Sequence, residues 1–111
     1  MNILILCHGN KYRSPLCAAI LKKVNPKLEV RSRGFRKDFA RAAKPIREYA
    51  QSIGCNLEEH RSLEVEKDDL LWANLIIFMD PSNLKRLLHK IVEINGNSVE
   101  QVTADYHCLG E

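Results

Sequence analysis

The sequence has 111 residues, which is room for one domain, and we expect that domain to span residues 1–111. Hydrophobic residues make up 45% of the chain and no apolar run approaches 18 residues, so disorder and a membrane-spanning helix are both excluded. The net charge of +3 is modest, and residues 1–6 lack the basic region and the length of a signal peptide, so we expect a cytoplasmic protein without a membrane partner.

Strand and helix signals alternate along the chain. In order, they predict a strand over 3–6, a helix over 14–24, a strand over 28–32, a helix over 42–53, a helical turn near 68–72, a strand over 75–79, a helix over 81–94 and a weak strand over 99–102. Ser14 is expected to cap the first helix, with Pro15 in its first turn, and Gly54 to end the second. This alternation predicts an α/β domain with a mostly parallel sheet, in which ligands collect beyond the carboxyl ends of the strands.

The segment after the first strand has the form C-x5-R-S and begins at Cys7. Successive backbone N–H groups of a loop this long can point inward and form a nest for an oxyanion. The helix that follows adds its unpaired N-terminal donors. Arg13 can close the loop and present a planar fork to two phosphate oxygens. The spacing therefore predicts a phosphate-binding cup.

Cys7 would lie at the floor of this cup, a setting that favours the thiolate form of a cysteine. Ser14 can donate a hydrogen bond to the sulfur as it leaves. Gly9 and Asn10 permit a positive φ, and Asn10 can also brace the loop from within. A sulfur nucleophile beneath a bound tetrahedral anion indicates covalent attack on phosphorus, through a cysteinyl-phosphate and with no metal or cofactor.

The loop resembles the active-site loop of the low-molecular-weight protein tyrosine phosphatases, which read C-x-G-N-x-C-R-S-P. Further similarities follow in order along the chain, at Ser32-Arg33-Gly34, at Gly54 with His60-Arg61-Ser62, and at Ile76-Ile77-Phe78-Met79-Asp80. The resemblance implies a flavodoxin-like three-layer fold with a four-stranded parallel sheet. It also implies hydrolysis of phosphotyrosine in a phosphorylated protein substrate.

The chain departs from the family at three places. Tyr12 replaces the family's second loop cysteine, the redox partner of the nucleophile, and Cys17 is expected to pack in the core instead. The family's general acid is the aspartate of an Asp-Pro-Tyr motif, and here the resemblance points to Asp105, which Tyr106 follows without the proline. The family's last helix is expected to be missing, because the sequence ends at Glu111.

A phenyl ring beside the phosphoryl group needs aromatic walls, for which Phe35, Phe39 and Tyr106 are candidates, although phenylalanines more often pack in the core. Lys11 at the rim either attracts a doubly anionic ester or points to solvent. The residues expected to bind substrate are His8, Gly9, Asn10, Lys11, Tyr12, Ser14, Phe39 and Tyr106.

Charge and cysteine usage bear on the partners. Residues 22–47 contain ten basic and two acidic residues, a net charge of +8, whereas residues 48–111 carry −7. The basic segment favours an anionic partner, or it is a solvated face balanced by the acidic half. A phosphorylated protein is the expected partner and nucleic acid is not.

Cys7, Cys17, Cys55 and Cys108 have no zinc-finger spacing, so reduced thiols and no metal site are expected.

The sequence leaves three functions open. In the first, a phosphatase, Cys7 attacks, Arg13 holds the phosphoryl group and Asp105 protonates the leaving group. The second is a thiol-dependent arsenate reductase, which needs a pair of resolving cysteines, and Cys55 and Cys108 are not placed as such a pair. The third is a catalytically weak or inactive module that binds phosphate or phosphoprotein.

Overall fold

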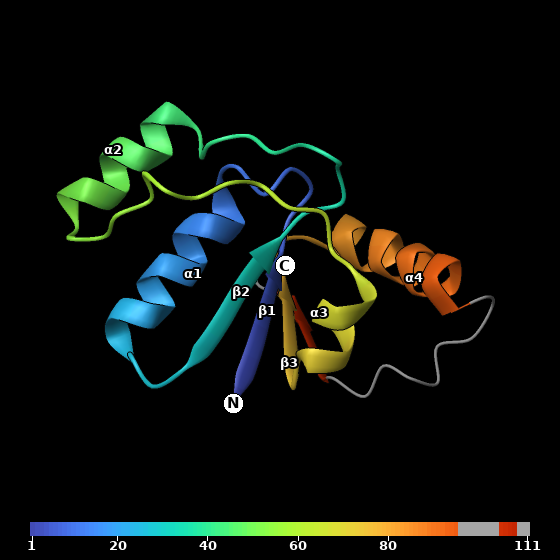
Figure 1. Ribbon diagram of the computed structural model, residues 1–111. Helices are drawn as coiled ribbons and strands as arrows, with labels where there is room; N and C mark the ends of the chain where they lie inside the picture. Colours follow the sequence, from blue (N-terminus) through green and yellow to red (C-terminus); the bar gives the residue numbers. More distant parts are fainter. Residues whose placement is uncertain (96–104, 109–111) are drawn as a thin grey trace.

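The computed structural model describes residues 1–95 and 105–108, with the side chains of Asn95 and Tyr106 excepted. Strands and helices alternate in it as the sequence predicts, except that the last described strand covers residues 105–108, which were not predicted to form one (Figure 1). The elements are β1 (Asn2–Leu6), α1 (Arg13–Val24), β2 (Glu29–Arg33), α2 (Lys44–Ser52), α3 (Lys67–Trp72), β3 (Leu75–Phe78), α4 (Pro81–Asn95) and β4 (Asp105–Cys108). The strand expected over 99–102 lies outside the described residues.

The four strands form one parallel sheet in the order β2-β1-β3-β4. At one end of the sheet Leu6 of β1 lies between Arg33 of β2 and Phe78 of β3, and Phe78 in turn pairs with Cys108. At the other end Ile3 pairs with Leu75, which pairs with Asp105. The carboxyl ends of all four strands therefore lie along one edge, and a group just beyond one strand is close to groups just beyond its neighbours.

The alternating side chains of the strands divide the core between two faces. On one face Leu4, Leu6, Ile76 and Phe78 pack with α3 and α4, whose Leu70, Leu87 and Ile91 are buried. On the other face Ile3, Ile5 and Val30 pack with α1. Helix α2 packs on the outer side of α1 through a third cluster that includes Ala50 and Leu57. Figure 1 shows this layering, with the segments that follow β2 and α2 crossing over the carboxyl edge of the sheet.

Helix α1 begins differently from the prediction. Arg13 is its first residue and Tyr12 its N-cap, which makes no side-chain capping bond. Ser14 lies inside the first turn and is fully buried, and its hydroxyl is used by the loop instead. Ser14 was expected to be the cap because a serine followed by a proline occurs in the sequence whether the serine caps the helix or lies inside its first turn. No helix among the described residues is long and apolar enough to cross a membrane.

Candidate active site

Cys7 follows β1 directly at the carboxyl edge of the sheet, and only 4% of its surface is exposed. Two groups surround its sulfur. The backbone N–H of Asn10 donates a hydrogen bond to Sγ at 3.2 Å, and the Ser14 hydroxyl lies 3.0 Å from the same atom. The loop curls back over the cysteine because residue 10 takes a left-handed conformation, with φ of 55°. Both donors are suited to holding negative charge on sulfur.

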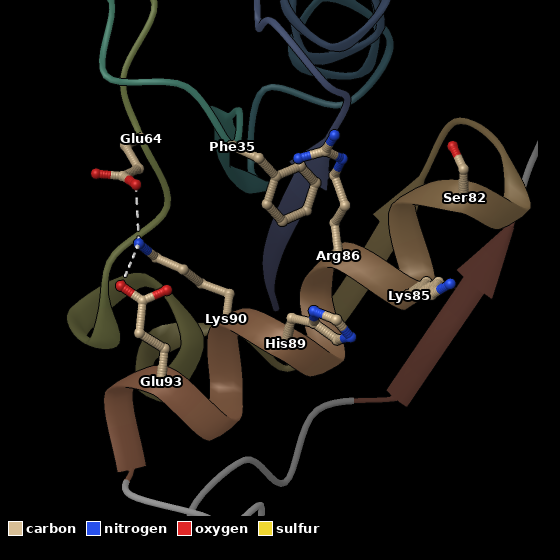
Figure 2. A pocket seen from close by; sticks show the side chains of 8 residues that line it. All are labelled: Phe35, Glu64, Ser82, Lys85, Arg86, His89, Lys90 and Glu93. Atoms are coloured by element: carbon tan, nitrogen blue, oxygen red, sulfur yellow. Dashed lines mark hydrogen bonds and ion pairs between the residues drawn. The ribbon is translucent and has the colours of Figure 1, made fainter.

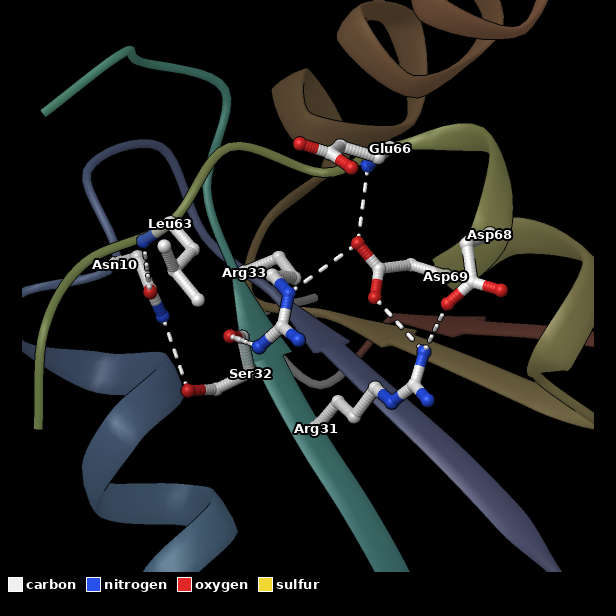
Figure 3. A network of polar contacts seen from close by, with 8 residues as sticks. All are labelled: Asn10, Arg31, Ser32, Arg33, Leu63, Glu66, Asp68 and Asp69. Carbon is white, nitrogen blue, oxygen red and sulfur yellow. Dashed lines mark hydrogen bonds and ion pairs between the residues drawn. The ribbon is translucent and has the colours of Figure 1, made fainter. Parts of the chain in front are cut away.

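The side chain of Asn10 braces the loop from within, as the sequence predicts. It is fully buried, and its Nδ2 donates to the Ser14 hydroxyl at 2.8 Å and to the Ser32 hydroxyl at 3.1 Å. Its Oδ1 accepts a bond from the backbone N–H of Leu63 at 3.0 Å (Figure 3). Because the Ser14 oxygen accepts from Asn10, its own proton is free to be donated to the sulfur of Cys7.

Two neighbouring segments hold the outside of the loop. His60 Nε2 lies 2.8 Å from the backbone oxygen of Asn10, and burial lowers the pKa of this imidazole, which favours its neutral form. The backbone N–H of Phe35 donates to the carbonyl of His8 at 2.9 Å, so His8 serves through its backbone while its side chain is exposed. A Cβ on Gly34 would lie 2.9 Å from that same carbonyl, so glycine is required for this close approach.

Arg13 extends from the first turn of α1 toward the carboxyl end of β3. Its Nη2 pairs with Asp80 Oδ2 at 3.1 Å, and about half of its side chain is exposed. Asp80 also accepts bonds from the backbone and hydroxyl of Ser82. These Ser82 bonds, followed by that of Arg13, hold the pKa of Asp80 below its usual value. The guanidinium therefore has a fixed anionic partner on one side and remains open to a ligand on the other.

A cavity of about 640 Å³ opens above the loop. Its floor and rim are made by Cys7, His8, Gly9, Lys11, Tyr12, Arg13, Arg36, Ala43, Lys44 and Pro45. The stem of Lys11 lies across Gly9, and its ammonium pairs with Asp38 at 3.1 Å. The structure thus brings together the cysteine, the arginine and most of the loop residues expected to bind substrate. Asn10 and Ser14 lie behind them as supports.

The aromatic wall differs from the expectation. Phe39 is 71% exposed and does not line this cavity. Phe35 faces a separate cavity of about 480 Å³ against α4, where Lys90 pairs with Glu64 and Glu93 (Figure 2). Tyr12 is the aromatic residue that lines the cavity over Cys7 among the described residues. The side chain of Tyr106 lies outside what the structure describes.

Asp105 does not reach the cup. It is the first residue of β4 and pairs with Leu75 at the amino edge of the sheet, where its backbone N–H bonds to Asn74. Cys7 lies four residues beyond Ile3, the residue level with Leu75, which is about 13 Å along the strands at ~3.3 Å per residue. The assignment of Asp105 as general acid does not fit this fold. A group on this edge strand could reach Cys7 only from beyond Cys108, and those residues lie outside the described part.

Two carboxylates do lie near the cup, Asp80 and Asp38. The pKa of Asp80 is lowered as described above, and the hydrogen bond from Lys11, with the charge of Arg36, lowers that of Asp38. Both groups are thus held ionised, which suits a partner for a cation and not a proton donor. No cluster of three His, Cys, Asp or Glu that could hold a metal ion occurs in the described part of the chain.

Asp80, Arg36 and Lys44 were not predicted as site residues. Asp80 carried a usable signal, because it follows a buried strand and parallel strands present their carboxyl ends together. Arg36 and Lys44 lie among ten basic residues of one segment, and only the folded chain separates the two that line the cavity from the rest.

A parallel α/β sheet with a thiol at the floor of a strand-to-helix loop and an arginine at its rim defines a class of protein that binds tetrahedral oxyanions beside a nucleophilic sulfur. The chain belongs to the low molecular weight phosphotyrosine protein phosphatase family, whose model matches residues 2–107. Members of this family are phosphatases.

Two relatives show the range of the family. The chain is 29% identical over 96 residues to the low molecular weight protein-tyrosine-phosphatase Wzb of Escherichia coli K12, covering 86% of this chain and 65% of the relative. It is 30% identical over 93 residues to a protein-arginine-phosphatase of Geobacillus stearothermophilus, covering 82% of this chain and 62% of the relative. The chain thus spans less than two thirds of the length of either relative.

Solved structures agree with the fold. An arginine phosphatase from Drosophila superposes with a TM-score of 0.85 at 25% identity, covering 98% of this chain and 71% of that one. Wzb of Vibrio vulnificus, in complex with benzylphosphonate, superposes with a TM-score of 0.77 at 26% identity, covering 86% of this chain and 69% of that one. The four-stranded parallel sheet of this chain is the sheet of the family.

Proposed function

We propose that this chain hydrolyses phosphotyrosine, or a related phosphate monoester, through a cysteinyl-phosphate. The observation that carries the proposal is the sulfur of Cys7, which is buried at the floor of a cavity, faces two hydrogen-bond donors and lies in the same cavity wall as Arg13. The phosphoryl group of the ester would occupy the curl of the loop, where backbone N–H groups and the start of α1 favour an oxyanion.

Each bond change has a group in this chain to support it. The thiolate of Cys7 attacks phosphorus, a P–S bond forms and the P–O bond to the phenol breaks, with the electron pair leaving on that oxygen. Arg13 holds two of the phosphoryl oxygens throughout. Water then attacks the cysteinyl-phosphate: a P–O bond forms, the P–S bond breaks with its electron pair returning to sulfur, and the product leaves as dihydrogen phosphate, which carries the protons of the water and gives one of them to solvent. The Ser14 hydroxyl stabilises the sulfur as it leaves, because Asn10 leaves its proton free for that bond.

The reductase alternative finds no support among the described residues. Cys7 belongs to the core cluster on the α1 face of the sheet. Cys55 belongs to the cluster between α1 and α2, and Cys108 contacts the cluster on the opposite face. A relay needs cysteines that can approach the nucleophile one after another, and these two are distributed over separate packing layers.

The test is hydrolysis of 4-nitrophenyl phosphate, whose acidic phenol leaves without a general acid. Wild type is expected to turn over, whereas Cys7→Ser and Arg13→Ala should each lose at least about a thousandfold in kcat/KM, because they remove the nucleophile and the clamp. Cys17→Ser is the matched control. Burial raises the pKa of the Cys17 thiol and keeps it protonated, so this variant should retain activity.

Two results would contradict the proposal. Activity that survives in Cys7→Ser would mean that another group attacks. A wild-type chain that binds inorganic phosphate without any turnover would instead identify a binding module. Folding of each variant is checked by its circular dichroism spectrum, so that loss of activity is not confused with unfolding.

A further inference from the structure

We infer that the cavity above Cys7 selects a phosphotyrosine flanked by acidic residues in a peptide segment, with Arg36 and Lys44 as the cations that receive the acidic side chains. The inference rests on the proposed function and specifies its substrate.

The wall of this cavity is strongly cationic. Among the described residues that line it, Lys11, Arg13, Arg36 and Lys44 are basic and none is acidic. Under the proposed function, Arg13 binds the phosphoryl group of the substrate. Three further cations therefore surround the space in which the rest of the substrate must lie, and a dianionic phosphoryl group held by Arg13 does not need all of them.

The nearby carboxylates do not neutralise these three cations. Asp38 is shared between Lys11, at 3.1 Å, and Arg36, at 3.5 Å, and these two cations hold its pKa low. One negative charge therefore faces two positive ones. Among the described residues, the acidic partner of Lys44 is Glu48, at 3.9 Å on the same helix, with 78% and 65% of the two side chains exposed. Such a pair contributes little in water, so Lys44 is free to turn toward a ligand.

Other cations of the basic segment are engaged elsewhere. Arg31 and Arg33 pair with Asp69 below the loop, at 3.1 and 3.2 Å. Arg41 and Arg47 share Glu58. These pairs join parts of the fold to one another. The charge of residues 22–47 that faces the cavity is therefore carried by Arg36 and Lys44, not by the segment as a whole.

This arrangement discriminates between substrate classes. A neutral phenyl ring can lie beside Tyr12 and the stem of Lys11, while carboxylates on neighbouring residues of a peptide meet Arg36 and Lys44 at the rim. A phosphoarginine would bring a guanidinium into the same space, among cations and without a lining carboxylate to receive it. Like charges repel, so the cavity disfavours that substrate.

The experiment compares kcat/KM for three phosphotyrosine peptides whose flanking residues are acidic, neutral or basic. At low ionic strength we expect the acidic peptide to exceed the neutral one by about tenfold and the basic one by more. The preference should shrink severalfold at 0.5 M salt, because charges on an open rim are screened over a few ångströms.

Two double variants with the same change in net charge separate local from long-range attraction. Arg36→Gln/Lys44→Gln should bring the ratio of acidic to neutral peptide to within about twofold, because the two cations that receive the acidic side chains are gone and Lys11 stays paired with Asp38. Lys27→Gln/Lys37→Gln removes two exposed cations of the same basic segment that do not line the cavity. This control should keep the wild-type ratio.

Binding to the Cys7→Ser variant repeats the comparison without turnover and includes a phosphoarginine peptide with neutral flanks. We expect the same order, with phosphoarginine weakest. The inference is overturned if acidic and neutral peptides bind and react equally well, if both double variants lower the ratio alike, or if phosphoarginine binds best. Failure of the proposed function is a separate result, namely no Cys7-dependent hydrolysis of 4-nitrophenyl phosphate, and the binding order then still decides whether the acidic segment docks.

Discussion

The side-chain amide of Asn10 bonds to Ser14 within the loop that follows β1 and joins this loop to β2 and to the segment around Leu63, while its own backbone adopts a conformation that most side chains disfavour. A backbone φ of 55° has a higher conformational free energy than the usual negative φ of a loop residue, and asparagine tolerates this left-handed region better than most residues. The hydrogen bonds of its buried side chain to Ser14, Ser32 and the backbone of Leu63 offset this conformational free energy. Conformation and hydrogen bonding therefore both favour asparagine at this position.

Two substitutions separate these contributions. Asn10→Ala removes the bonds and retains a side chain that resists a positive φ, so we expect it to lower the free energy of unfolding by about 2–4 kcal/mol. Asn10→Gly removes the same bonds but relaxes the backbone, and it should be about 1 kcal/mol less destabilising than alanine. Urea unfolding measures both. Equal losses in the two variants would show that the backbone conformation is not strained.

At the scale of elements, ion pairs and a carboxylate cap hold helix α3 against the sheet. The helix has six residues, too few to be stable alone. Asp69, which is nearly buried, caps it by accepting a bond from the Glu66 backbone at 3.0 Å. The same carboxylate binds Arg31 and Arg33 of β2 (Figure 3). The guanidinium of Arg31 also lies 4.1 Å from the centre of the Trp72 ring. The carboxylate of Asp69 thus connects α3 to β2, the strand whose following residues contact the loop.

Asp69→Asn is expected to lower the free energy of unfolding by about 2–4 kcal/mol, because Arg33 loses its anion and Arg31 keeps only the exposed carboxylate of Asp68 among its partners in the described residues. Asp68→Asn is the matched control on the adjacent residue. Its carboxylate also contacts Arg31, but 82% of its side chain is exposed, and the change should cost no more than about 0.5 kcal/mol. Thermal unfolding of the two variants gives the comparison. Similar losses in both would mean that the network contributes through general charge and not through the buried carboxylate.

The elements predicted from the sequence are those whose signal is local. The apolar runs of β1 and β3, the periodic faces of α2 and α4, and Gly54, with φ of 80°, lie where the patterns indicated. The N-cap of helix α1 is Tyr12, two residues before the predicted cap Ser14, whose hydroxyl bonds to Cys7 and Asn10 instead of capping. A serine that caps a helix and a serine buried in its first turn have the same local sequence, and only their tertiary hydrogen-bond partners distinguish them.

At the scale of the whole molecule, the site is assembled from segments that the sequence cannot pair. Asp80 is 67 residues from Arg13, and His60 is 50 residues from Asn10. The loop itself was predictable because its nucleophile, its turn and its helix start are contiguous. The sequence left open whether the basic segment is a solvated face or a binding surface, and the structure divides its members between internal ion pairs and the cavity rim.

The position of β4 in the sheet leads to a prediction about the leaving group. A general acid that protonates a phenol accelerates hydrolysis by about 10²–10⁴-fold, and the effect is greatest for the least acidic phenols. Asp105 lies at the amino edge of the sheet and is exposed, so Asp105→Asn should leave kcat within about twofold of wild type for every substrate in a series from 4-nitrophenyl phosphate to phenyl phosphate. Phosphotyrosine belongs at the phenyl phosphate end of that series.

The same series tests whether any carboxylate in the described part acts as the acid. Asp80 and Asp38 are held ionised by their partners, so a wild-type enzyme that relies on them should slow steeply as the phenol becomes less acidic. A selective loss for phenyl phosphate in Asp105→Asn, with 4-nitrophenyl phosphate unaffected, would contradict the placement of β4 and restore Asp105 as the acid. Glu29→Gln serves as a control at the same amino edge of the sheet, where it also removes one exposed carboxylate far from Cys7 and should leave both rates unaltered.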